Sequence, residues 1–149
     1  MGLIEDLLRE DNEIRVLNDS TFRSEGEAFL FILYTCLNFN PTWRQSELSD
    51  IVMLSKKKNI LKGIDTSVAI KRFFSIQSSF GIHEPTKLAI GYLSSDSKAA
   101  IFICCLDFTL RFTKQLEGRS RYIDYLIQEL KLDNKTSMLI AEIFRTKYL

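Results

Sequence analysis

The sequence predicts a compact, all-helical domain, and three observations lead to this. Apolar residues recur at the spacing of one helix face in segment after segment. The alternation of apolar and polar residues around tight turns that marks β-hairpins is absent from the sequence. Only two prolines and six glycines interrupt 149 residues, and most fall where the helical spacing lapses. We therefore expect one domain over residues 1–149, built as a bundle of about seven helices.

Composition narrows the class of protein. Hydrophobic residues make up 46% and charged residues 26% of the chain, which is typical of a globular protein and excludes a disordered one. The net charge of +1 provides no general attraction to nucleic acid or to an anionic membrane. The longest apolar run, residues 28–37, is shorter than the roughly 20 residues that a membrane span needs. We expect neither a nucleic-acid partner nor a membrane span.

The first residues and the cysteines indicate in which cellular compartment the protein is expected. The opening MGLIEDLLRE is too charged for a secretory signal and resembles a short amphipathic helix. Asp6 stands where a lipid anchor at Gly2 would require Ser or Thr. Cys36, Cys104 and Cys105 lie in apolar runs, so we expect buried thiols. Their odd number and the missing signal favour a reducing, cytoplasmic location.

Three helices are expected in the first half of the chain. Ser24 and Glu27 form a capping-box pattern that opens a helix to about Asn38. After a turn at residues 40–42, the spacing predicts a second helix over residues 46–57. A third follows a break at Gly63, with a cap among residues 65–67 and an end at Gly81. Its apolar positions are Val68, Ala69, Ile70, Phe73, Phe74 and Ile76.

Four more helices are expected in the second half. Pro85 suits the first turn of a helix over residues 85–93. The next helix, residues 98–112, is capped by Asp96 or Ser97 and is apolar nearly all round, so we expect it to be the central one. Gly118 separates it from a helix over residues 120–130. A last helix, capped by residue 133 or 134, ends near residue 147.

The two halves of the chain share a faint pattern. Residues 28–33 align with residues 100–105, and residues 66–70 align with residues 136–140 at nearly the same shift. This suggests two pseudo-equivalent helical triplets, at about residues 24–78 and 97–147. The alternative is that common apolar helix residues match by chance.

The loop after the first expected helix carries a family resemblance. Its segment FNPTWRQSE, residues 39–47, resembles the loop of tellurite-resistance TerB-like domains, which reads Ala-Asp-Gly, five residues and then Glu. Glu47 keeps the acid, whereas Asn40 and Pro41 stand in place of Asp and Gly. In the second copy, residues 113–115 replace Ala-Asp-Gly and Arg121 replaces the Glu. The resemblance implies a duplicated, all-helical fold whose acidic loops bind metal or partners, but most of those acids are missing here.

Few residues suggest catalysis or a cofactor. His83, the single histidine, has no nucleophile or orienting group nearby in sequence, so an exposed loop residue is expected instead of a general base. Paired Cys or His spacings, a calcium loop and a phosphate-binding glycine loop are all absent from the sequence. We therefore expect no catalytic residue, no cofactor and no metal site.

One basic run stands out, formed by Lys56, Lys57, Lys58 and Lys62. Cations at a helix C-terminus are favoured by the helix dipole, which explains the run without a ligand. A contact with phosphate or an acidic partner requires that Arg44 and the pair Lys71–Arg72 converge with it in space.

The turn after the first expected helix is the candidate partner-binding surface. Its large aromatic residues either cap the core or anchor an interface. The candidate residues are Phe39, Asn40, Trp43, Arg44 and Glu47. The leading hypothesis is a non-enzymatic protein-interaction module, related to stress or tellurite resistance as the TerB-like resemblance implies. The alternatives are a small-molecule or metal-binding domain with a pocket between the triplets, and an enzyme whose site assembles from scattered residues.

Overall fold

The computed structural model describes residues 16–38, 59–112 and 116–133, together with Lys135, Met138, Leu139 and Glu142. Of these residues 76% are helical and none forms a strand, which confirms the predicted all-helical class. The described elements are α2 (Glu25–Asn38), the 3-10 turn η1 (Asn59–Leu61), α4 (Thr66–Phe80), α5 (His83–Gly91), α6 (Ser95–Phe112) and α7 (Leu116–Leu130). No helix of this described part is both long enough and apolar enough for a bilayer span.

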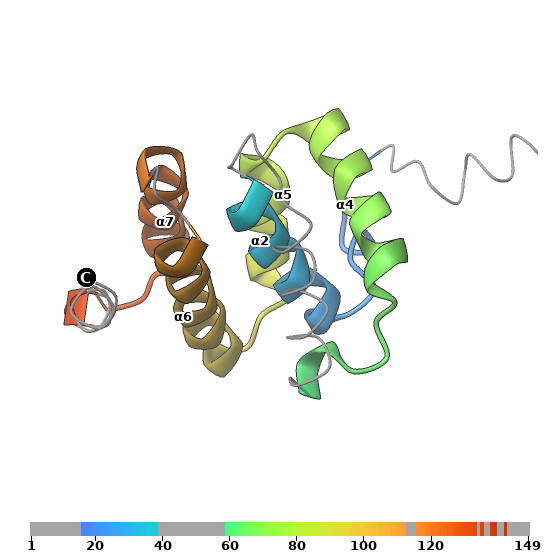
Figure 1. The fold of residues 1–149 in the computed structure, drawn as a ribbon. Coiled ribbons are helices and arrows are strands. Elements are labelled where there is room, and N and C mark those ends of the chain that lie inside the picture. Colours follow the sequence, from blue (N-terminus) through green and yellow to red (C-terminus); the bar gives the residue numbers. More distant parts are fainter. Residues whose placement is uncertain are drawn as a thin grey trace, which may run out of the picture.

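Helix α2 is the centre of the packing. It contacts each of the other described elements, and Figure 1 shows it between α4 on one side and α6 and α7 on the other. Every residue from 28 to 34 is at most 4% exposed. Among the described elements, α2 is therefore the central one, and not the helix expected over residues 98–112. In α6 the Ile103 side chain is 39% exposed.

The ends of α4 follow the local signals in the sequence. Asp65 is the N-cap, and its carboxylate accepts a hydrogen bond from the backbone N–H of Val68 at 3.3 Å. Gly81 follows the last turn with φ of 77°, a left-handed conformation that a residue with a Cβ rarely adopts. Both features confirm the predicted limits of the third helix.

Three helices begin earlier than the sequence analysis predicted. Helix α5 begins at His83, so Pro85 lies inside its first turn. The cap of α6 is Ser94, whose Oγ accepts from the backbone N–H of Ser97 at 3.2 Å; neither Asp96 nor Ser97 is the cap. Helix α7 begins at residue 116 and contains Gly118, which was expected to separate two helices. A single glycine costs a helix only about 1 kcal/mol, which packing offsets.

Two expected helices bear on the predicted duplication. The second, over residues 46–57, lies outside the described residues. Of the last one, Lys135, Met138, Leu139 and Glu142 are described and are helical. The pairing of two helical triplets therefore stays a prediction.

Candidate functional site

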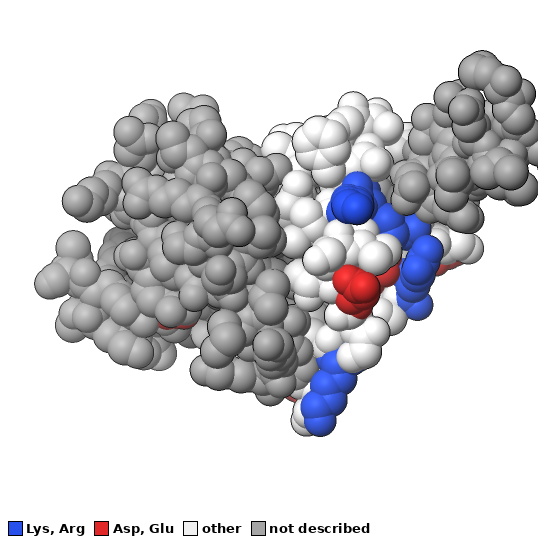
Figure 2. Space-filling view, turned by 45° about the vertical axis from the view of Figure 1, so that its right-hand side comes forward, with Lys and Arg blue, Asp and Glu red and all other residues white. Residues whose placement is uncertain are grey.

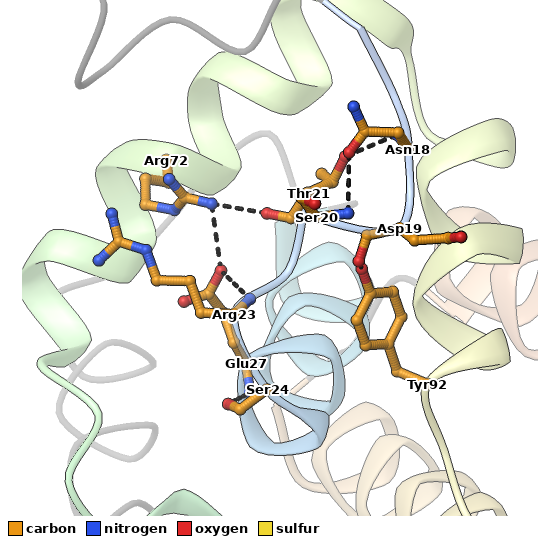
Figure 3. A network of polar contacts seen from close by, with 9 residues as sticks. All are labelled: Asn18, Asp19, Ser20, Thr21, Arg23, Ser24, Glu27, Arg72 and Tyr92. Atoms are coloured by element: carbon orange, nitrogen blue, oxygen red, sulfur yellow. Dashed lines mark hydrogen bonds and ion pairs between the residues drawn. The ribbon is translucent and has the colours of Figure 1, made fainter.

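A buried ion pair joins α4 to the start of α2. The Nη2 of Arg72 donates to the carboxylate Oε1 of Glu27 at 3.3 Å and to the backbone carbonyl oxygen of Thr21 at 2.6 Å (Figure 3). The two charged side chains are only 10% and 7% exposed. The structure thus buries one of the two cations, Lys71 and Arg72, that were considered for a surface patch.

Ser24 and Glu27 form half of the predicted capping box. The Oγ of Ser24 accepts from the backbone N–H of Glu27 at 3.1 Å, as the pattern requires. The Glu27 carboxylate bonds to the backbone N–H of Arg23 at 3.3 Å, not to that of Ser24. The same carboxylate oxygen receives the Arg72 guanidinium, so Glu27 serves both the helix start and the ion pair.

The segment before α2 is held from two sides. Within it, the backbone N–H of Asn18 donates to Thr21 Oγ1 at 2.9 Å, and the backbone N–H of Thr21 returns a bond to the Asn18 carbonyl at 3.0 Å. Arg72 holds the Thr21 carbonyl from α4, while the hydroxyl of Tyr92, which follows α5, donates to the carbonyl of Asp19 (Figure 3). Together these contacts fix where α2 begins relative to α4 and α5.

The two arginines at this junction differ in their partners among the described residues. Arg72 has its carboxylate partner in Glu27, but its buried Nε has no hydrogen-bond acceptor. Arg23 is exposed, and its guanidinium makes no hydrogen bond or ion pair with the described residues. Its side chain extends toward α4, the helix that carries Arg72 (Figure 3).

A second polar cluster lies inside the core. The hydroxyls of Tyr122 and Thr86 are 3.0 Å apart and link α7 to α5. Thr35 of α2 donates to the carbonyl of Phe31 at 2.8 Å and accepts from Gln77 Nε2 of α4 at 3.0 Å. Burial raises the pKa of Tyr122 well above its ordinary value, so this hydroxyl stays protonated and neutral. The cluster therefore connects helices without introducing a charge.

The three cysteines are buried thiols, as predicted, and none of them is in a disulfide. The Cys36 Sγ donates to the backbone carbonyl of Cys105 at 3.8 Å, which links α2 to α6. Burial raises the pKa of Cys105 well above its ordinary value, and the neighbouring Cys36 raises it further. Because the thiolate is the reactive form, Cys105 is a poor nucleophile.

His83 is exposed, as predicted, but it belongs to the first turn of α5. Its ring lies edge-on to that of Tyr125, with centroids 4.6 Å apart, and its backbone carbonyl accepts from the Tyr125 hydroxyl at 3.0 Å. Burial, with Glu129 and Glu84 nearby, raises the pKa of Tyr125 to about 12. Among the described residues, no group of three or more His, Cys, Asp or Glu is placed to hold a metal ion.

The candidate partner-binding residues lie outside the described part of the chain. These are Phe39, Asn40, Trp43, Arg44 and Glu47, and the run Lys56, Lys57 and Lys58 lies outside it as well. The interface at this turn therefore stays a prediction.

The exposed face of α4 was missed by the sequence analysis. Phe74 is 65% exposed and Val68 is 47% exposed, although both are among the apolar positions of the third expected helix. Phe73, the neighbour of Phe74, is fully buried. Adjacent helix residues point about 100° apart, so the Phe73–Phe74 pair was the available signal that one ring faces outward.

The chain was also compared with known proteins. No protein-family model matches the sequence, and neither the curated proteins nor the solved structures contain a match.

Proposed function

We propose that this chain is a non-enzymatic helical module that binds a protein partner, with the outer face of α4 as part of the contact surface. The observation that carries the proposal is the exposure of Phe74, at 65%, on a helix whose buried face is anchored by Phe73 and Ile76. Aromatic side chains are enriched among the residues that dominate interface energies. An exposed Phe held on a rigid helix can serve as such an anchor with little loss of backbone entropy.

The chemistry of the α4 face favours a partner segment that is apolar and acidic. Helix α4 contains no Asp or Glu, and its exposed cation, Lys71, lies between Val68 and Phe74 along the chain. Figure 2 shows the side of the molecule where α4 lies, with more basic than acidic side chains on it. Charge complementarity of this kind steers association and sets partner choice.

The TerB-like resemblance supports a setting for this module. It implies a stress or tellurite-resistance complex, in which the turn at residues 39–47 would form a second part of the contact surface. Trp43 is the test residue of that turn. If it anchors a partner, Trp43→Ala should weaken binding with little change in melting temperature, whereas a core tryptophan should cost about 3–5 kcal/mol.

The experiment compares two exposed apolar residues of similar exposure. Phe74→Gln removes the anchor on α4, and Leu139→Gln, at a residue 62% exposed, is the matched control far from α4 in the chain. Each purified variant is immobilised, a cell lysate is applied, and bound proteins are quantified. We expect at least about a tenfold loss of the captured protein with Phe74→Gln, or about 1.4 kcal/mol, and no loss with Leu139→Gln.

Two further outcomes are decisive. Binding to an acidic segment should weaken at high salt, because exposed charges are screened. Full capture by Phe74→Gln would overturn the assignment of α4. A wild-type dimer in sedimentation that Phe74→Gln abolishes would show that the face binds a second copy of the chain, which also contradicts a separate acidic partner.

A further inference from the structure

We propose that Arg23 and Arg72 form an oxyanion-binding site at the junction of α2 and α4, suited to one phosphate or carboxylate group. The proposal is independent of the partner surface on α4, because it concerns a small anion and can be tested without any protein partner.

Arg23 and Arg72 donate hydrogen bonds to the same carboxylate oxygen, Arg23 through its backbone and Arg72 through its guanidinium group. Oε1 of Glu27 accepts from the Nη2 of Arg72 and from the backbone N–H of Arg23, both at 3.3 Å. The backbone of Arg23 is therefore tied to the guanidinium of Arg72. From this point the Arg23 side chain extends toward α4, on the same side as Arg72 (Figure 3).

Some N–H groups of the Arg72 guanidinium have no hydrogen-bond acceptor, although the side chain is buried. A guanidinium carries five N–H groups, and the two protein acceptors of Arg72 both bind its Nη2. Its Nε is buried and has no acceptor, although the side chain is only 10% exposed.

The charge at the junction also favours an anion. Glu27 neutralises one guanidinium, and Arg23 adds a second that has no acidic partner among the described residues. Guanidinium groups match the geometry of phosphate and carboxylate, and their charge-assisted hydrogen bonds are stronger than neutral ones.

The test follows the Arg72 guanidinium directly. Inorganic phosphate is titrated into the ¹⁵N-labelled protein while the side-chain Nε–H signals of the arginines are recorded by NMR. We expect the Arg72 signal to shift and saturate. Arg23→Gln should weaken the affinity for phosphate by about tenfold or more, which corresponds to the loss of one charge-assisted hydrogen bond. Lys87→Gln, which removes an exposed cation on α5, should leave the affinity unchanged.

Parallel titrations identify the kind of anion. A response to phosphate but not to acetate supports a phosphate group, whether free or on a partner, and a response to both supports a carboxylate. Sodium chloride at matched ionic strength is the reference for simple screening. An Arg72 signal that stays unmoved, that moves equally in chloride, or that responds equally in Arg23→Gln would overturn the proposal. Arg72 itself is left unchanged because its removal would also destabilise the fold.

Discussion

Arg72 and Glu27 lie in different helices and form an ion pair that solvent barely reaches, with their side chains 10% and 7% exposed. The same guanidinium nitrogen holds the carbonyl of Thr21. This pair therefore positions both the first turn of α2 and the segment before it against α4. Its removal tests how much of the fold depends on one contact.

We expect Arg72→Met to lower the free energy of unfolding by about 3 kcal/mol, because it leaves Glu27 buried without a cation. Urea denaturation measures the loss. Arg23→Gln is the control, since Arg23 contributes its backbone N–H to Glu27 and the substitution should cost less than about 0.5 kcal/mol. The double variant Arg72→Met, Glu27→Leu should recover much of the loss. A single variant as stable as the wild type would show that the pair is dispensable.

The hydroxyls of Tyr122 and Thr86 should show coupled energies. Tyr122→Phe or Thr86→Val alone leaves a partner hydroxyl in the core with one bond fewer and should cost about 1–2 kcal/mol. Removing both should cost less than the sum of the two single effects, because no orphaned hydroxyl of this pair remains. A double-mutant cycle in urea measures the coupling, and strict additivity would argue against the hydrogen bond.

Two helical glycines should respond oppositely to alanine. A Cβ at Gly26 would lie 2.0 Å from the backbone carbonyl oxygen of Ile60, so Gly26→Ala forces α2 and η1 apart. We expect a loss of at least about 2 kcal/mol. A Cβ at Gly91 meets nothing within 4 Å, so Gly91→Ala should be neutral or stabilise by up to about 1 kcal/mol. Thermal melting compares the two, and equal effects would contradict the close approach of α2 and η1.

Stability should fall at alkaline pH. The pKa of Tyr125 is raised from 10.0 to about 12 in the fold, so between these values the unfolded chain releases a proton that the folded chain retains. The free energy of unfolding therefore decreases as pH rises through this window. Tyr122 and Cys105, whose pKa values are also raised by burial, act in the same direction. Denaturation at several pH values should show a shallower decline for Tyr125→Phe, and an identical decline would contradict the Tyr125 contribution.

Interactions between residues close together in the chain determine where several helices begin and end. These limits could be predicted from the sequence. The Ser24 and Asp65 caps, the stop at Gly81 and the burial of the cysteines follow from hydrogen bonds and apolar spacing along single helices. The start of α6 was missed because several polar residues in a row could cap it, and only the structure shows Ser94 in that role.

The packing of helices against one another determined which helix faces are buried and which are exposed to solvent. The burial of Arg72 depends on Glu27 and Thr21, which lie 45 and 51 residues away in the chain. The exposure of Phe74 beside the buried Phe73 depends on which side of α4 meets α2 and α5. Helices α2 and α6 are both apolar nearly all round, and α2 is the central one because the other described elements surround it. By itself the sequence determined where most helices form, whereas long-range packing determined which of their side chains face water.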